Sequence, residues 1–190
     1  MTEIDKIFAG SIPELYNTYL VPLIFEAYAA DLARRVSGPL PRTVLETAGD
    51  SGVVTRVLAR RVPSEARYVV TDLNPPMLDH AQAQQGEDSR IEWQQADALN
   101  LPFEDGVFDV VLSQFGAMFF PDKVAGFAEA KRVLRKSGRF VFNVWDSIEH
   151  NEFADVVTSA AAEIFPNDPP RFLARTPHGY HDVDVIRAGM

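Results

Sequence analysis

The sequence has no cysteine among its 190 residues. This absence excludes disulfides, thiolate metal sites and cysteine nucleophiles, and it is typical of a cytoplasmic protein. No apolar run approaches the roughly 20 residues that a membrane-spanning helix needs. The first six residues also lack the basic and then apolar pattern of a secretory signal. We therefore expect a cytoplasmic protein with no membrane partner.

Basic residues are scarce. The 18 Lys and Arg are outnumbered by 27 Asp and Glu, which gives a net charge of −9. A general nucleic-acid binder needs a basic face, so we expect no nucleic-acid partner. A small-molecule substrate remains compatible with this charge. No grouping of His, Asp and Glu has the spacing of a metal site, and no nucleophile motif is present.

Strand and helix patterns alternate from residue 43 onward. Apolar runs predict strands at about residues 43–46, 67–71, 91–94, 108–113 and 140–145. Helical patterns start near Val53, Pro75 and Asp122, and we interpret Asp122 as a helix N-cap. Such alternation implies parallel pairing with right-handed crossovers. The sequence therefore predicts an α/β fold with a doubly wound parallel sheet.

Helical patterns also flank this region on both sides. Residues 11–14 read as a capping box with proline in the first turn, and helical periodicity continues from residue 21 to residue 36. After the fifth strand, a helical segment at 152–165 precedes a proline-rich break and a capped helix start at Asp182. We expect a single domain over 1–190, with a helical lid (1–38), a nucleotide-binding core (39–146) and a helical tail (147–190).

Three of the predicted strands are followed by an acid, namely Glu46, Asp72 and Asp97. A turn of small residues, 48–52, follows the first of them. In open α/β sheets, ligands bind at the carboxyl ends of the strands. The order acid, small turn, acid, acid suits a ligand with an ammonium group, a ribose diol and an exocyclic amine. S-adenosylmethionine (SAM) has all three.

Five motifs in order make the chain resemble a class I SAM-dependent methyltransferase of the group that acts on small molecules. They are residues 44–52, 71–78, 95–98, 108–111 with 114–115, and 132–139. The resemblance implies a Rossmann-like sheet ordered 3-2-1-4-5 with N-terminal helices over the cleft. It also implies SAM as cofactor and a small-molecule methyl acceptor as substrate.

The resemblance further implies a role for individual residues. Glu46 and the 48–52 turn would contact the methionine part of SAM, Asp72 the two ribose hydroxyls, and Asp97 with the Ala98 amide the adenine. Leu73 and Met77 would pack on the adenine faces. The implied cofactor-binding residues are Glu46, Ala48, Gly49, Asp50, Gly52, Asp72, Leu73, Met77, Asp97, Ala98 and Gln114. Gln114 and Phe115 would lie between cofactor and substrate, and Tyr16 and Tyr19 would act as lid residues; no catalytic base is implied.

The chain departs from the family pattern at two places. Asp50 stands where the family turn has its middle glycine, and its charge would face the SAM carboxylate. At about 5 Å and an effective dielectric near 20, this repulsion is roughly 3 kcal/mol, so we expect Asp50 to weaken cofactor binding. The family also has a C-terminal antiparallel strand pair, and this chain ends before it. The fifth strand would then be an apolar edge, and we expect a homodimer that covers it.

Other interpretations remain open. A non-catalytic methyltransferase-like subunit that binds a partner is favoured by both departures. A nicotinamide-dependent oxidoreductase shares the sheet and the acid after strand two, but its turn needs Gly-x-Gly-x-x-Gly and this turn has only Gly49 and Gly52. His181 is a candidate base, although a loop role is more frequent for a histidine without a fixed partner. Phe119 and Phe120 are interpreted as core or pocket wall.

Overall fold

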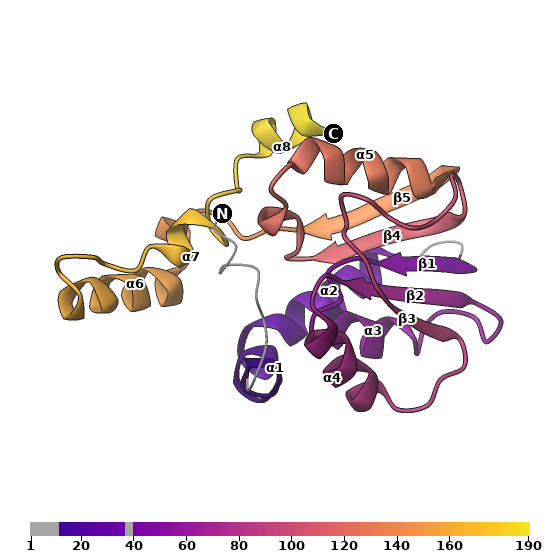
Figure 1. The fold of residues 1–190 in the computed structure, drawn as a ribbon, viewed down its shortest axis with the longest axis horizontal. Coiled ribbons are helices and arrows are strands. Elements are labelled where there is room, and N and C mark those ends of the chain that lie inside the picture. Colours follow the sequence, from indigo (N-terminus) through magenta and orange to yellow (C-terminus); the bar gives the residue numbers. More distant parts are fainter. Residues whose placement is uncertain (1–11, 37–39) are drawn as a thin grey trace.

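The computed structural model describes residues 12–36 and 40–190, and Figure 1 shows their arrangement. The strands are β1 (Thr43–Glu46), β2 (Arg67–Asp72), β3 (Ile91–Gln95), β4 (Phe108–Gln114) and β5 (Leu134–Asn143). The helical segments are α1 (Ile12–Leu15), η2 (Tyr16–Phe25), α2 (Glu26–Arg35), α3 (Val53–Leu58), α4 (Pro75–Gln85), η3 (Ala117–Phe119), α5 (Lys123–Val133), η4 (Ile148–His150), α6 (Glu152–Ile164), α7 (Phe172–Arg175) and α8 (Val183–Gly189).

The five strands form one sheet in the order β3-β2-β1-β4-β5, and every neighbouring pair is parallel. The predicted fold and strand order are confirmed. Successive residues of β1 point to opposite faces, as the two-residue period of a strand requires. Val44 packs in one cluster with residues of α2 and α3, whereas Leu45 packs in another with residues of α5. Helices therefore cover both faces of the sheet.

The N-terminal helical segment is one run over residues 12–35 with a wide, π-type stretch, η2, in its middle. The two helical patterns of the sequence thus form one continuous element. Pro22 lies inside η2, and it has no N–H to donate to the preceding turn. Residue 11, where the predicted capping box starts, lies outside the described residues, and so do residues 37 and 38 of the predicted lid.

The predicted bounds of β5 are wrong at both ends. The strand starts at Leu134 because that residue pairs with Phe108, ahead of a register shift in β4. The Arg135 guanidinium also donates to the Asp109 carboxylate at 2.5 Å. The Lys-Ser-Gly sequence at 136–138 therefore lies within a strand, although it is typical of a turn. The strand ends at Asn143, whose carbonyl and side-chain oxygens accept from the Phe115 amide.

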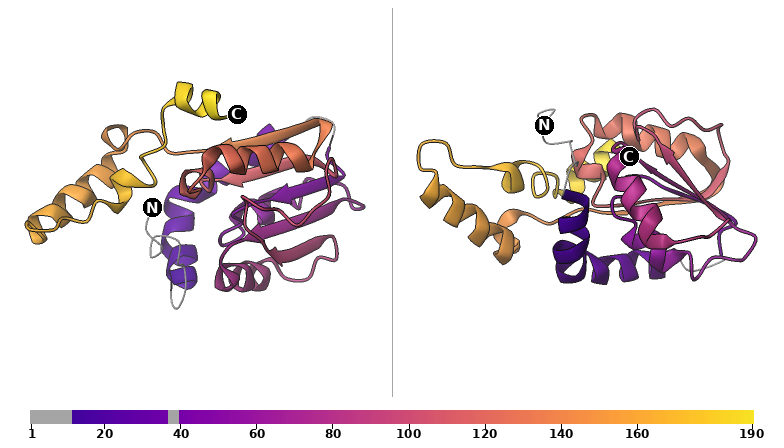
Figure 2. Two further views of the ribbon diagram at one scale, coloured as in Figure 1. Left: turned by 45° about the horizontal axis from the view of Figure 1, so that its top comes forward. Right: turned by 60° about the horizontal axis from the view of Figure 1, so that its bottom comes forward.

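The C-terminal tail leaves the sheet after β5. Both views of Figure 2 show α6 and α7 projecting away from the sheet and its helices. The last helix, α8, returns to lie against α5 (Figure 1). Helix α3, whose pattern in the sequence extends to Arg61, ends at Leu58, and a turn follows in which the Leu58 carbonyl accepts from Arg61 and Val62.

Candidate functional site

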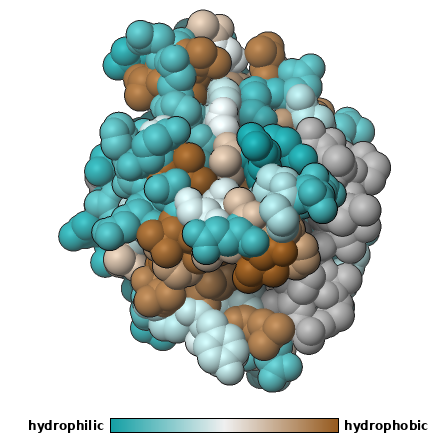
Figure 3. Space-filling view, turned by 90° about the vertical axis from the view of Figure 1, so that its left-hand side faces the viewer, coloured by the Kyte–Doolittle hydropathy of each residue, from teal (hydrophilic) through white to brown (hydrophobic). Residues whose placement is uncertain are grey.

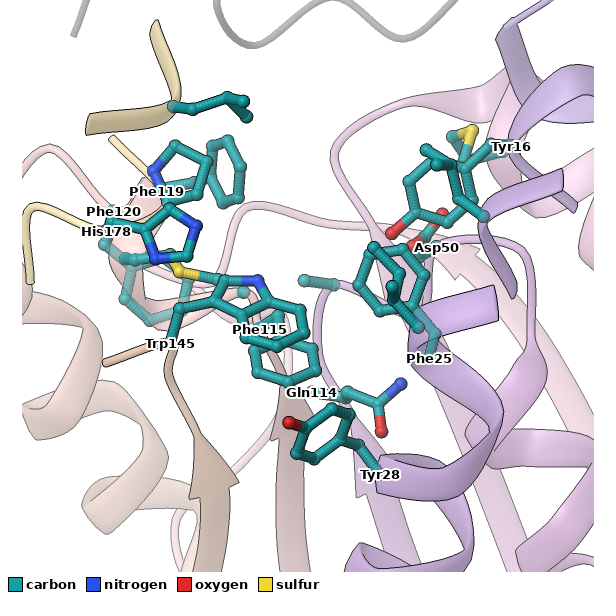
Figure 4. A pocket seen from close by; sticks show the side chains of 18 of the residues that line it. Tyr16, Phe25, Tyr28, Asp50, Gln114, Phe115, Phe119, Phe120, Trp145 and His178 are labelled. Atoms are coloured by element: carbon teal, nitrogen blue, oxygen red, sulfur yellow. The ribbon is translucent and has the colours of Figure 1, made fainter. Parts of the chain in front are cut away.

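A cavity of about 760 Å³ opens at the carboxyl ends of the strands. This volume lies within the roughly 300–1,000 Å³ that is usual for small-molecule sites. Residues that follow β1, β2, β3 and β4 line it, together with the N-terminal helical segment and the tail. Figure 4 shows Tyr16 and Asp50 at one side of this space and Phe119, Phe120 and His178 at the other.

Ten of the residues predicted for the site line this cavity. They are Tyr16, Ala48, Asp50, Asp72, Leu73, Met77, Asp97, Ala98, Gln114 and Phe115. Phe119 and Phe120, interpreted as pocket wall or core, line it as well. Four predicted residues are not among the lining residues, namely Tyr19, Glu46, Gly49 and Gly52.

Glu46 points into the core rather than into the cavity. Its side chain is buried, and Oε2 accepts hydrogen bonds from the Tyr68 hydroxyl at 2.5 Å and the Thr55 hydroxyl at 2.7 Å. Burial raises the pKa of Glu46 to about 7, against the two hydrogen bonds that lower it. The carboxyl group therefore links β1, β2 and α3 behind the turn. An acid at a strand end is visible in a sequence, but the direction of its side chain is not.

The two glycines of the turn serve packing. A Cβ on Gly49 would overlap Cγ1 of Val70, and its amide donates to the Thr71 carbonyl at 2.9 Å. Gly52 has φ +75° and a Cβ there would lie 3.0 Å from that of Ala81. Glycine at both positions lets the turn lie directly on β2 and α4. Tyr19, the fourth residue outside the lining, lies on η2 with 64% of its surface exposed to solvent.

Asp50 is accommodated in the turn and half-buried at the cavity. Its φ of +52° is left-handed, a region that aspartate tolerates better than most residues. Its amide donates to Oδ2 of Asp72 at 3.0 Å, and the Tyr16 hydroxyl donates to its carboxylate. Oδ1 is buried without a hydrogen-bond partner among the described residues. Burial, with the nearby charge of Asp72, raises the pKa of Asp50 to about 7.

Two further acids of the cavity, Asp72 and Asp97, accept hydrogen bonds from backbone amides. Oδ1 of Asp72 accepts from the Asn74 amide at 2.8 Å, and burial raises the pKa of this carboxyl group. Oδ1 of Asp97 accepts from the Leu99 amide at 2.9 Å, and Asp97 is exposed. Each carboxylate oxygen has two lone pairs, so both groups can accept further hydrogen bonds from a ligand.

The charge of the lining is one-sided. Asp50, Asp72, Asp97 and Glu152 line the cavity, and no Lys or Arg does so among the residues that the structure describes. A concave site lined by one sign of charge concentrates ligands of the opposite sign. The end of the cavity that Asp50, Asp72 and Asp97 line, here called the acidic end, therefore favours a cationic ligand with several hydrogen-bond donors.

The opposite end of the cavity is aromatic. Phe115, at φ +53°, stacks on Trp145 with ring centroids 4.0 Å apart and planes 4° from parallel. Tyr28 meets both rings edge-on, and Phe25 is tilted against them. The side chain of Gln114 lies near this group, and its buried Oε1 has no hydrogen-bond partner within the described part of the chain (Figure 4).

The lining also contains residues that were not predicted for the site, among them Trp145 and His178. Trp145 lies two residues beyond the end of β5 and was interpreted only as an apolar strand residue. His178 comes from the tail, and its ring is 5.9 Å from that of Trp145. The loop histidine singled out in the sequence, His181, instead contacts the His178 carbonyl at 2.8 Å through Nδ1. Only the return of the tail to the strand ends brings His178 to the cavity, and no local pattern signals that.

Comparison with known families decides to which family the chain belongs. Residues 45–142, more than half of the chain, match the family described as "Methyltransferase domain". The chain belongs to the class I SAM-dependent methyltransferases. This assignment displaces the nicotinamide-dependent alternative and makes SAM the cofactor of the family.

Individual relatives agree with the assignment. The chain is 33% identical over 141 residues to a demethylmenaquinone methyltransferase of Deinococcus radiodurans, and the alignment covers 73% of this chain and 58% of the relative. It is 28% identical over 159 residues to a ubiquinone/menaquinone biosynthesis C-methyltransferase of a Marinomonas species, covering 77% and 63%. The chain thus spans about three-fifths of the length of these relatives.

Solved structures share the fold. A methyltransferase structure from Bacillus halodurans superposes with a TM-score of 0.64 at 24% identity, covering 85% of this chain and 66% of that one. Among the residues that the structure describes, no helix is both long and apolar enough to cross a bilayer.

The cavity fits SAM, the cofactor of the family. The cofactor carries a sulfonium, an ammonium and an exocyclic amine, and the acidic end supplies negative charge and acceptors for them. Asp50 Oδ1 and Gln114 Oε1 are unpaired buried acceptors within the described residues, and buried polar atoms are normally hydrogen-bonded. A ligand that donates to them would satisfy both.

Proposed function

We propose that this domain binds SAM at the acidic end of the cavity and transfers its methyl group to a small-molecule nucleophile held at the aromatic end. The observation that carries the proposal is the convergence of Asp50, Asp72 and Asp97 on one cavity. These residues follow three different strands, and the same cavity continues to the stacked pair of Phe115 and Trp145.

Each cavity residue has a proposed task. Asp72 accepts from the ribose hydroxyls with its remaining lone pairs, and Asp97 accepts from the adenine amine beside the Ala98 amide. Leu73 and Met77 pack on the adenine. Tyr16 covers the methionine part beside Asp50, whereas Tyr19 could act as a lid only after moving, because it is exposed. Glu46, Gly49 and Gly52 support the turn from behind.

The chemistry at this site depends on positioning. The sulfonium of SAM supplies the reactivity, so the protein has to orient the acceptor and exclude water. The aromatic end suits an apolar acceptor with a flat ring. A quinone-type acceptor, such as the one in the name of the Deinococcus relative, is one candidate for it.

Calorimetric titration with SAM and S-adenosylhomocysteine tests the proposal. We expect wild type to bind both ligands and Asp72→Ala to lose affinity for both. Asp79→Ala is the matched control, because Asp79 is an exposed carboxylate on α4 outside the lining. Unchanged binding by Asp72→Ala would remove Asp72 from the site. Absence of binding by wild type at millimolar ligand would favour the alternative of a partner-binding, non-catalytic subunit.

A further inference from the structure

The aromatic end of the cavity contains a histidine, His178, whose backbone amide and carbonyl groups both form hydrogen bonds. His178 is buried, with 6% of its surface exposed. Its amide donates to the Leu173 carbonyl at 3.0 Å, and its own carbonyl lies 2.8 Å from Nδ1 of His181. Figure 4 shows its imidazole beside the indole of Trp145, across the cavity from Tyr16 and Asp50.

The hydrogen bond of the ring determines its tautomer. Nδ1 lies 2.8 Å from the carbonyl oxygen of Asp146, and a carbonyl can only accept. Nδ1 therefore carries the hydrogen, and in the neutral ring Nε2 is left as an acceptor. Within the described residues, no hydrogen bond occupies Nε2. The aromatic end thus presents a neutral nitrogen acceptor with a fixed direction.

We propose that His178 recognises the methyl acceptor: Nε2 accepts a hydrogen bond from a hydroxyl group on an aromatic ring that packs beside Trp145 and Phe115. The inference rests on the proposed function and adds a substrate class, aromatic alcohols, and the residue that selects them. An apolar ring matches the walls of this end, and a hydroxyl matches the acceptor, which an ether or a plain hydrocarbon would leave unpaired.

The same contact gives the hydroxyl proton a destination. With SAM bound, the acceptor oxygen would bond to the methyl carbon while the sulfur–methyl bond breaks and its electron pair stays on the sulfur of S-adenosylhomocysteine. The O–H bond breaks in the same step, its electron pair stays on the oxygen, and the proton passes to Nε2. His178 then becomes a cationic imidazolium and returns the proton to water after the reaction. The carbonyl of Asp146 keeps its hydrogen bond from Nδ1 throughout, so the ring does not need to reorient.

Binding of matched probes tests the recognition step. We expect wild type to bind 2-naphthol about 10-fold more tightly than 2-methoxynaphthalene, in line with one neutral hydrogen bond. In His178→Phe the ratio should fall to about 1, because the ring is kept and the acceptor is lost. In His178→Gln an acceptor remains and part of the preference should persist. His150→Gln is the control, since 71% of the His150 side chain is exposed, and it should behave as wild type.

Three binding results would contradict recognition by His178. Equal affinity of wild type for the two probes, no binding of 2-naphthol, or a preference that persists in His178→Phe would each overturn the proposal. Nitrogen NMR of the histidine rings gives a second readout. We expect a hydrogen on Nδ1 of His178 and a change at Nε2 when 2-naphthol is added; a hydrogen on Nε2 would contradict the tautomer.

Turnover tests the proton transfer. With SAM and 2-naphthol, wild type should form methylated product, and His178→Gln should lower kcat by about 100-fold or more with a smaller change in KM. No product from wild type, or equal kcat in the variant, would remove the proton-transfer step. Titration of the same samples with SAM separates the proposed function from the role of His178. If wild type does not bind SAM but still prefers 2-naphthol over 2-methoxynaphthalene, only the proposed function is contradicted.

Discussion

At the scale of single residues, Asp50 has the strongest consequence for stability. Its pKa of about 7 in the folded protein lies well above the ordinary 3.8. Between these values the unfolded chain releases the proton and the folded protein keeps it, so stability falls as pH rises from about 4 to about 7. A shift of this size corresponds to at most about 4 kcal/mol.

The isosteric variant Asp50→Asn removes this charge and keeps an oxygen that can accept from Tyr16. We expect the free variant to melt at a higher temperature than wild type at pH 8, with a smaller gain at pH 5, as measured by scanning calorimetry. The gain should differ by about 2 kcal/mol between these pH values. Asp79→Asn is the control and should show no such dependence. A variant less stable than wild type at pH 8 would mean that the Asp50 carboxylate is needed in the turn.

Asp50 also predicts a ligand preference. The amino-acid portion is common to SAM and S-adenosylhomocysteine, whereas only SAM has the positive sulfonium, which the acidic lining attracts. In Asp50→Asn we expect S-adenosylhomocysteine to gain affinity, by up to about 100-fold if its carboxylate is close, and the ratio of SAM to S-adenosylhomocysteine affinity to fall. Calorimetry at low salt measures both values. An unchanged ratio would place Asp50 too far from the sulfur to matter.

Residue roles could be predicted where strand ends determine them. Asp72 and Asp97 line the cavity because parallel strands all end at one edge, and that edge follows from the alternation in the sequence. Glu46 occupies an equivalent position, yet Tyr68 and Thr55 turn it into the core. These partners lie 22 and 9 residues away, so the orientation depends on tertiary packing.

At the scale of elements, β5 shows how far sequence patterns extend. The first four strands start where predicted and end within one residue of the prediction, because each is a short apolar run between turns. Strand β5 was predicted over residues 140–145, but it starts six residues earlier, at Leu134, and ends two residues earlier, at Asn143. Residues 135–137 near its start are polar, and the pairing of Leu134 with Phe108 and the contact of Arg135 with Asp109 make this segment a strand.

Both faces of β5 are packed by the chain itself. Phe140 and Phe142 stack at 4.8 Å and both meet Phe127 of α5, whereas Val141 packs with the core on the opposite face. We expect Phe142→Ala to lower the unfolding free energy by about 2 kcal/mol, since the side chain is half-buried. Thermal melts should shift by about 4–8 °C. Phe165→Ala, at a phenylalanine that is 57% exposed, is the control and should shift little; equal shifts would mean that the Phe127 contact contributes nothing.

At the scale of the whole molecule, two surfaces are candidates for self-association. The edge of β5 has no strand neighbour among the described residues, and an unpaired edge offers backbone groups to another chain. Helix α6 offers an apolar surface, because Val156, Ile164 and the following Phe165 are exposed. Figure 3 shows apolar side chains gathered on the face of the molecule toward which α6 projects.

We predict a homodimer through the β5 edge, as the sequence suggested, because strand addition needs only backbone groups that are already aligned. Light scattering at micromolar concentration should give the mass of a dimer, and hydrogen exchange of residues 134–143 should slow as the protein concentration rises. The double variant Val156→Glu with Ile164→Glu leaves that edge intact, so it should still dimerise with the same protection of β5. Loss of the dimer in this variant would place the interface on α6. A monomer at every concentration would contradict the dimer and would mean that β5 is sufficiently protected by its own chain. That protection would come from the packing of β5 against its helices and from Arg139, whose guanidinium donates to the Val36 carbonyl.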